Sequence, residues 1–191
     1  MTPAPVDGDE RRDRLTEALL ELVAERGLEG ASVRTVAARA GVSIGTVQHY
    51  FPTKESMLLH AYRRVGEDIG ARAEERAAGA PSAKAALRAV LLELLPLDAR
   101  RTAALRISIA FALHSLQAPA LASVLRDDLA ELQAVVAAIC TLAGAAEPEL
   151  EARLALAVTA GLSEPLLFGD GSFEPSDAVA ALDAHLERAL P

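Results

Sequence analysis

The chain has 191 residues and a formal charge of −8, and 51% of its residues are hydrophobic but only 3% aromatic. Alanine and leucine are abundant and β-branched runs between turns are scarce, which predicts an all-α fold. No apolar run reaches the ~18–20 residues of a membrane span. Residues 1–12 lack the order of a signal peptide and are expected to be a disordered lead-in. With Cys140 as the single cysteine, we expect a reduced, cytoplasmic protein without a disulfide, metal or cofactor.

The first predicted helix covers about residues 9–26, and Gly27 is expected to end it. Its apolar residues recur at i, i+3, i+4, i+7 and i+8, which is the spacing of a single buried stripe. The stripe consists of Leu15, Ala18, Leu19, Leu22 and Val23.

Two short predicted helices then flank a glycine turn. The first is Val33–Ala40, with Ser32 as its N-terminal cap and Gly41 at its end. The second is Ile44–Tyr50, capped by Ser43. Helices this short are not stable alone, so we expect them to pack on the first helix as a helix-turn-helix head.

A long linking helix is predicted over Lys54–Ala78, after Pro52 breaks the pattern and Thr53 caps the new helix. Gly66 and Gly70 lie one turn apart within it, where each glycine costs about 1 kcal/mol relative to alanine. They indicate either close helix packing or a soft point in a helix that moves. The spacing by itself favours close packing.

Five further helical patterns follow, each bounded by proline, glycine or an acidic cap. They cover residues 87–95, 98–117, 119–143, 147–168 and 175–190. The predicted plan is a three-helix head, a linking helix and a C-terminal helical bundle. We assign DNA binding to residues 1–52, and ligand binding and dimerisation to residues 53–191.

Charge is distributed unevenly along the chain. Residues 31–64 hold five basic side chains against Glu55 alone, a net charge of +4, so the rest of the chain sums to −12. A small basic patch on an acidic protein indicates a local anionic partner, and the helix-turn-helix spacing makes double-stranded DNA the leading candidate.

The second helix of a helix-turn-helix lies in the major groove, where its first residues reach the base edges. Gln48 can read adenine, and Lys54 can hold a phosphate at a helix N-terminus. The alternative for His49 and Tyr50 is half-buried packing, and for Arg34 and Arg39 it is a solvated charge. The predicted DNA-binding residues are Arg34, Ser43, Ile44, Gly45, Thr46, Gln48, His49, Tyr50 and Lys54.

These residues also carry a family resemblance. Residues 35–37 (TVA) and 40–55 (AGVSIGTVQHYFPTKE) resemble the head of the TetR family of transcriptional regulators. The resemblance is specific over about residues 15–62. It implies an all-α homodimer in which each subunit offers one recognition helix, and a body whose small-molecule ligand alters DNA affinity. Family members commonly place a tyrosine two residues beyond Thr46, whereas this chain has Gln48, which favours a base contact over the family's phosphate contact there.

Two apolar stripes near the C-terminus are candidates for a dimer interface of four helices. Each stripe can instead face the core of its own subunit, and the resemblance favours the dimer. Pro165 is expected to bend or end the first of the two helices. The predicted interface residues are Leu150, Leu154, Val158, Leu162, Val179, Leu182 and Leu186.

A pocket with apolar walls and a few polar groups is predicted among residues 87–143, and it suits a small hydrophobic effector. Each of its residues taken singly is as well explained by ordinary packing. Cys140 is more typical of inert core than of a thiol sensor. The predicted ligand-binding residues are Leu91, Leu94, Arg106, Ile109, Phe111, His114, Gln117, Leu125 and Leu132.

The sequence therefore predicts a ligand-responsive DNA-binding regulator. It favours a repressor that binds a palindromic operator as a homodimer and is released by its effector. The alternative is a helical adaptor that binds protein. An enzyme is not expected, because the four histidines are scattered and no catalytic or phosphate-binding motif occurs.

Overall fold

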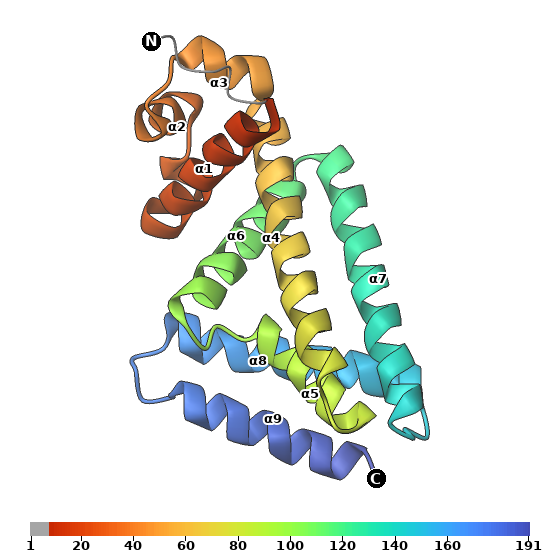
Figure 1. Ribbon diagram of the computed structural model, residues 1–191. Coiled ribbons are helices and arrows are strands. Elements are labelled where there is room, and N and C mark those ends of the chain that lie inside the picture. The colour runs from red at the N-terminus through yellow and green to blue at the C-terminus, as the bar shows by residue number, and fades with distance from the viewer. Residues whose placement is uncertain (1–7) are drawn as a thin grey trace. The chain divides into compact units, whose positions relative to one another are not determined.

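Nine α-helices and no strand make up residues 8–191, the part of the chain that the computed structural model describes (Figure 1). The predicted all-α class is confirmed. Most of the predicted lead-in, residues 1–7, lies outside the described residues, but residues 8–12 belong to the first helix. In chain order the helices are α1 (Gly8–Gly30), α2 (Val33–Ala40), α3 (Ile44–Tyr50), α4 (Lys54–Ala78), α5 (Ala83–Leu94), α6 (Ala99–Ser115), α7 (Pro119–Leu142), α8 (Pro148–Phe168) and α9 (Pro175–Ala189).

Helix α1 is two helical segments joined at Gly27, where φ is 70° and ψ is 178°. This backbone conformation favours glycine, so the predicted end of the helix is instead a break within it. The predicted apolar stripe of α1 is buried along its whole length, from Leu15 to Val23. It packs with α2, whose Val36 and Ala37 are also buried.

The caps of α2 and α3 are those predicted. The Ser32 hydroxyl accepts a hydrogen bond from the Thr35 backbone N–H at 3.2 Å, and the Thr35 hydroxyl accepts one from the Ser32 N–H at 2.8 Å. Gly41 ends α2 in the left-handed conformation with φ 67°. The Ser43 hydroxyl then accepts from the Thr46 N–H at 3.0 Å, so both ends of the turn are set by local interactions.

The two glycines inside α4 are not sites of close packing. A Cβ added at Gly66 or at Gly70 would meet no atom within 4 Å, and both residues are exposed. The packing interpretation favoured by the sequence is therefore wrong. The glycines weaken the middle of α4 without a compensating contact, which leaves the soft-point interpretation.

Alanine at either position is expected to stabilise the protein by about 0.5–1 kcal/mol, because it removes the glycine penalty without a clash. Urea unfolding of Gly66→Ala and Gly70→Ala would measure this gain. Gly41→Ala is the matched control and should lose stability, because alanine is strained at φ 67°. A loss of stability at Gly66 or Gly70 would show that the glycine is required there.

Two compact units divide the described chain. The first contains residues 8–66 and 106–121, and the second contains residues 67–105 and 122–191. The division thus falls inside α4, α6 and α7 rather than in loops. The predicted division after residue 52 concerns the roles of the segments and stays a prediction.

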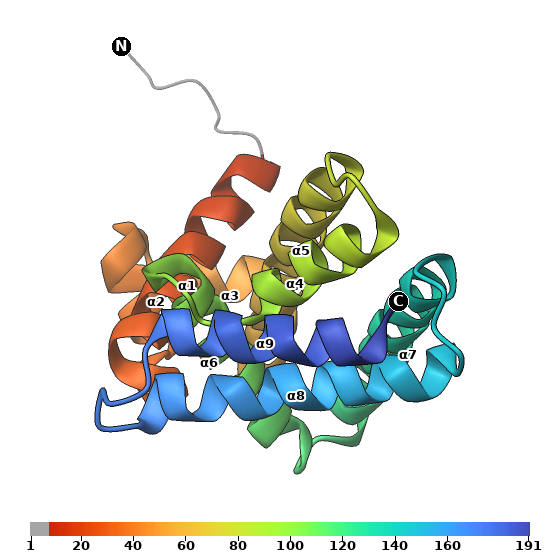
Figure 2. The same ribbon diagram turned by 90° about the horizontal axis from the view of Figure 1, so that it is seen from below.

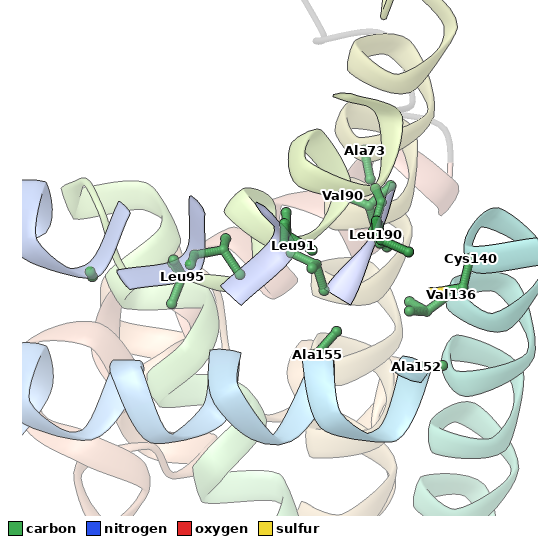
Figure 3. Packing of buried hydrophobic residues seen from close by; sticks show 13 residues of the cluster. Ala73, Val90, Leu91, Leu95, Val136, Cys140, Ala152, Ala155 and Leu190 are labelled. Atoms are coloured by element: carbon green, nitrogen blue, oxygen red, sulfur yellow. The ribbon is translucent and has the colours of Figure 1, made fainter. Parts of the chain in front are cut away.

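The core of the second unit is formed by α5, the second half of α7, α8 and α9, together with Ala73 of α4 (Figure 3). Helices α8 and α9 lie side by side and antiparallel, with α5 against both (Figure 2). Leu91, Leu182 and Leu186 are buried in this core. Cys140 lies there too, and burial raises the pKa of its thiol, with the carboxylate of Glu151 adding to the shift. The thiol is therefore held in its neutral form.

Helix α8 continues through Pro165 to Phe168, so the prediction that the helix could end at this proline is wrong. A proline keeps helical φ and costs chiefly one backbone hydrogen bond to the residue four positions earlier. That residue is the exposed Gly161, whose carbonyl water can reach. Residues 166–168 therefore extend the helix and do not fold over its end.

Candidate nucleic-acid interface

Helix α3 has one buried side and one exposed side. Val47 is fully buried and anchors the helix in the head. Ile44, Gly45, Gln48 and His49 are all exposed. These positions recur at i, i+1, i+4 and i+5, so they share one face of the helix.

The first turn of α3 combines a cap with an accessible backbone. The hydroxyls of Ser43 and Thr46 lie 2.9 Å apart, so the cap orients the Thr46 side chain. Ile44 is 46% exposed, which places an apolar side chain in solvent beside the capped turn. A Cβ on Gly45 would meet only the Ser43 hydroxyl, at 3.8 Å, so the space over this turn is open. A bulky partner can therefore approach the backbone here.

Tyr50 closes the last turn of α3 and is half-buried. Its ring meets the His49 ring edge-on, with the centroids 5.2 Å apart. The packing alternative therefore holds in part for Tyr50, whereas His49 remains exposed.

The basic residues around α3 fall into two groups. Arg34 and Lys54 are exposed, and neither forms an ion pair with the side chains of residues 10–27 or 30–191, which are those that the structure describes. Arg39 instead joins α2 to α1, with nitrogens 2.8 Å from Glu21 and 2.6 Å from Glu25. These contacts pair Arg39 with two carboxylates at the surface, so it does not contribute free charge to the basic patch.

Lys54 begins α4, where the helix N-terminus favours negative charge. The Thr53 hydroxyl caps this end by accepting from the Ser56 N–H at 3.0 Å. Hydrogen bonds from its own backbone N–H and then from Thr53 hold the pKa of Glu55 below its usual range. The carboxylate therefore stays ionised and occupies part of the same helix end, while Lys54 remains free to reach outward.

Sequence reasoning placed no residue of α1 beside the recognition helix. In the structure the guanidinium of Arg12 lies 5.9 Å from the centre of the Tyr50 ring. The available signal was the basic run Arg11, Arg12 and Arg14 near the start of the chain. Periodicity alone did not show that this run meets the end of α3.

The nine predicted ligand-binding residues are divided between the two units. Leu91, Leu94, Leu125 and Leu132 belong to the second unit, and Leu91 is fully buried in its core. Arg106, Ile109, Phe111, His114 and Gln117 belong to the first.

Three of the five residues in the first unit contact other helices of that unit. The Phe111 ring stacks on Tyr62, with the centroids 4.0 Å apart and the planes at 7°. Arg106 donates to the Ala24 carbonyl of α1 at 3.4 Å, and His114 lies 3.8 Å from the Glu55 carboxylate. Leu91 and Phe111 are buried side chains in this structure, and their part in a ligand pocket stays a prediction.

The predicted dimer residues also separate into two groups. Leu150 and Leu154 on α8 are 44% and 45% exposed, and Val158 and Leu162 follow them on the same helix half-buried. On α9, Val179 is half-buried, but Leu182 and Leu186 are buried within the subunit. These two leucines are therefore withdrawn from the predicted interface, because their side chains are covered by their own core.

Comparison with known proteins identifies the family. Residues 83–191 match the profile of the C-terminal domain of BetI-type transcriptional repressors, which is more than half of the chain. Residues 15–61 match the profile of the tetR family of bacterial regulatory proteins. The chain belongs to the TetR family. It is thus a transcriptional regulator of BetI type, and the adaptor and enzyme alternatives are not supported.

Individual relatives agree with this assignment. The HTH-type transcriptional regulator BetI of Burkholderia mallei is 32% identical over 174 residues, which cover 90% of this chain and 88% of that protein. Two other curated relatives match over shorter segments, so that the chain spans only 55% and 41% of their length.

Solved structures agree as well. The crystal structure of a transcriptional regulator from Rhodococcus sp. Rha1 is 38% identical, covers 93% of this chain and 95% of its own, and has a TM-score of 0.86. A protein from Saccharomonospora viridis, solved in complex with choline, has a TM-score of 0.87 over 95% of this chain and 98% of its own. At 22% identity its likeness concerns the fold alone.

Two further observations concern this TetR-family chain between residues 8 and 191. None of its helices combines the length and the apolar character that crossing a membrane requires. In the same range, no three histidine, cysteine or acidic side chains gather in a way that could hold a metal ion.

Proposed function

We propose that this TetR-family protein binds a palindromic operator as a homodimer, inserts α3 of each subunit into the major groove, and leaves the DNA when a small molecule binds the body. The observation that carries the proposal is the exposed face of α3. Its outward side chains are all accessible, its anchor Val47 is buried, and no acidic residue lies on the helix.

The residues of the head take different roles in this proposal. Gln48 reads a base edge, and Ile44 contacts a thymine methyl group. Arg34, Lys54 and His49 contact phosphates and set the register of the head on the duplex. Ser43, Gly45, Thr46 and Tyr50 complete the interface.

Dimerisation is proposed to use the exposed side of α8. Leu150 and Leu154 present apolar side chains to solvent, and a second copy of the chain would cover them in a two-fold arrangement. Two recognition helices about 34–36 Å apart would then meet successive major grooves. We retain residues 1–52 as the DNA-binding part and residues 53–191 as the ligand-binding and dimerisation part.

Repression with release by a small effector is proposed from the BetI-type C-terminal match. A ligand that acts as a switch must prefer the body conformation with low DNA affinity by several kcal/mol. The choline complex of the Saccharomonospora viridis protein makes choline one compound to test, beside small hydrophobic molecules.

Selection of tight-binding duplexes from a random library, followed by fluorescence anisotropy at several salt concentrations, tests the proposal. Gln48→Ala is expected to relax the preference at one base pair of each half-site, at a cost of about 1–3 kcal/mol. Lys54→Ala is expected to weaken all duplexes similarly and to reduce the salt slope by about one.

Arg126→Ala, an exposed arginine of α7, is the matched control and should bind like the parent. Selected sites without two-fold symmetry would contradict the dimer. A parent protein that binds all duplexes equally, with little salt dependence, would contradict the proposed function as a whole.

A further inference from the structure

A hollow of about 180 Å³ is lined by side chains of α1, the end of α3 and the first turns of α4. Figure 1 shows these three helix segments of the first unit. Its polar rim includes Arg12 of α1, Tyr50 of α3 and Arg63 of α4, and its apolar part includes Phe51 and Leu59. The two arginines are 51 positions apart in the sequence. Only the folded head brings their side chains to one place.

Every charged side chain that lines this hollow is basic, and no carboxylate lines it. Arg12 and Arg63 are both exposed, and neither forms an ion pair with the described side chains, which are those of residues 10–27 and 30–191. Two guanidinium groups beside an apolar surface repel each other unless an anion lies between them.

A second hollow of the head shows the contrasting arrangement. It has a volume of about 270 Å³ and is lined by Arg14 and Arg39 together with Glu17 and Glu21. Its Arg39 is already held by carboxylates. Carboxylates thus lie beside the arginines of that hollow, whereas none lines the Arg12 hollow, which leaves that hollow open to an external anion.

The geometry of the Arg12 hollow suits a tetrahedral oxyanion. The Arg12 guanidinium lies over the Tyr50 ring, 5.9 Å from the ring centre, and this cation–π contact limits the orientations of the guanidinium. Arg63 lines the same hollow from α4. Guanidinium groups bind phosphate oxygens through charge-assisted hydrogen bonds in a fixed planar geometry.

The position of Tyr50 selects the source of the phosphate. This residue closes α3 directly after Gln48 and His49, which are exposed on the face assigned to the groove. An anion held beside Tyr50 therefore lies next to DNA that α3 would enter. We propose that the Arg12–Arg63 hollow binds one backbone phosphate of the operator at the edge of each half-site, an inference that rests on the proposed function.

The test compares Arg12→Ala, Arg63→Ala and the double variant with the parent, on the duplex that the parent selects. Each single variant should reduce the slope of log affinity against log salt by about one, and the double variant by little more, because the proposed phosphate contact needs both arginines and is lost when either is removed. Between 50 and 200 mM salt the parent should lose about threefold more affinity than either single variant. Arg14→Ala, two positions from Arg12 and in the hollow that also contains Glu17 and Glu21, should match the parent.

A duplex series with single methylphosphonates locates the contact. One neutralised position per half-site should weaken the parent but leave Arg12→Ala unaffected. Unchanged salt slopes in both single variants would overturn the inference, as would full additivity in the double variant, which indicates two separate phosphates. Binding of inorganic phosphate that Arg12→Ala abolishes, combined with an unchanged DNA slope, would also overturn it and would identify a free-anion site.

These outcomes are separable from failure of the proposed function. If the parent selects a palindrome, and Lys54→Ala lowers the salt slope while Arg12→Ala does not, only the proposed phosphate contact of the Arg12–Arg63 hollow fails. If the parent shows no sequence preference at all, the proposed function fails first.

Discussion

Replacement of Glu93 by alanine is expected to lower the free energy of unfolding by about 3–5 kcal/mol, because it removes a buried carboxylate that pairs with the largely buried Arg72. The Glu93 side chain is 1% exposed. Its oxygens lie 2.8 Å from Arg72 and 2.9 Å from Arg76 of α4, and 3.6 Å from Arg101 of α6. One carboxylate of α5 thus joins three arginines from two other helices.

The loss of stability is expected to be large because Arg72 has no other carboxylate partner among the described side chains. Its side chain is only 17% exposed, and its Nη2 atom is already buried without a hydrogen bond. Arg101 is less dependent on Glu93, since it also contacts Asp98 at 2.8 Å and donates to the Leu92 carbonyl. Removal of Glu93 would therefore strand chiefly Arg72 in a partly desolvated position.

Urea unfolding followed by circular dichroism at fixed protein concentration measures the effect. Glu74→Ala, an exposed glutamate of α4, is the control and should change stability by less than about 0.5 kcal/mol. Glu93→Gln keeps the shape and removes only the charge, so it should fall between the parent and Glu93→Ala. Equal midpoints for Glu93→Ala and the parent would show that the cluster contributes nothing to folding.

Replacement of Phe111 by alanine is expected to destabilise the first unit by about 3–5 kcal/mol. Phe111 is 1% exposed, and its ring stacks on Tyr62 of α4. The variant would lose the transfer free energy of a buried aromatic ring, leave a cavity, and remove the stacking contact. This result would establish the ring as a packing residue of the head.

The experiment discriminates between the two roles considered for Phe111. A side chain that only lined an effector pocket would leave the unfolding midpoint unchanged and alter effector affinity alone. Leu113→Ala is the matched control, because Leu113 lies on the same helix and is 62% exposed. Both variants should be unfolded in urea at several protein concentrations, so that any change in dimerisation is separated from folding.

Local interactions explain why much of the head was predictable. The Ser32 and Ser43 caps and the Gly41 turn depend on residues within a few positions of each other. The buried stripe of α1 and the exposed face of α3 follow from helical periodicity for the same reason. Seven of the nine candidate DNA-binding residues are exposed and the other two, Thr46 and Tyr50, are half-buried, and their contacts with DNA stay predictions.

Long-range contacts explain what was mispredicted. An apolar stripe shows that one side of a helix is covered, but it does not show by what. Leu182 and Leu186 satisfy the periodicity of an interface and are nevertheless covered by their own subunit. Gly66 and Gly70 have the spacing of a packing motif and face open space.

The sequence by itself thus determined the helices, their caps, the acid-free recognition element and the family resemblance, because each depends on neighbours along the chain. Only the tertiary structure decided that Glu21 and Glu25 pair with Arg39, that Arg12 meets Tyr50, and that Phe111 packs in the head. These pairings join segments 14 or more positions apart. Their partners are chosen by how whole helices pack, which no local pattern of residues encodes.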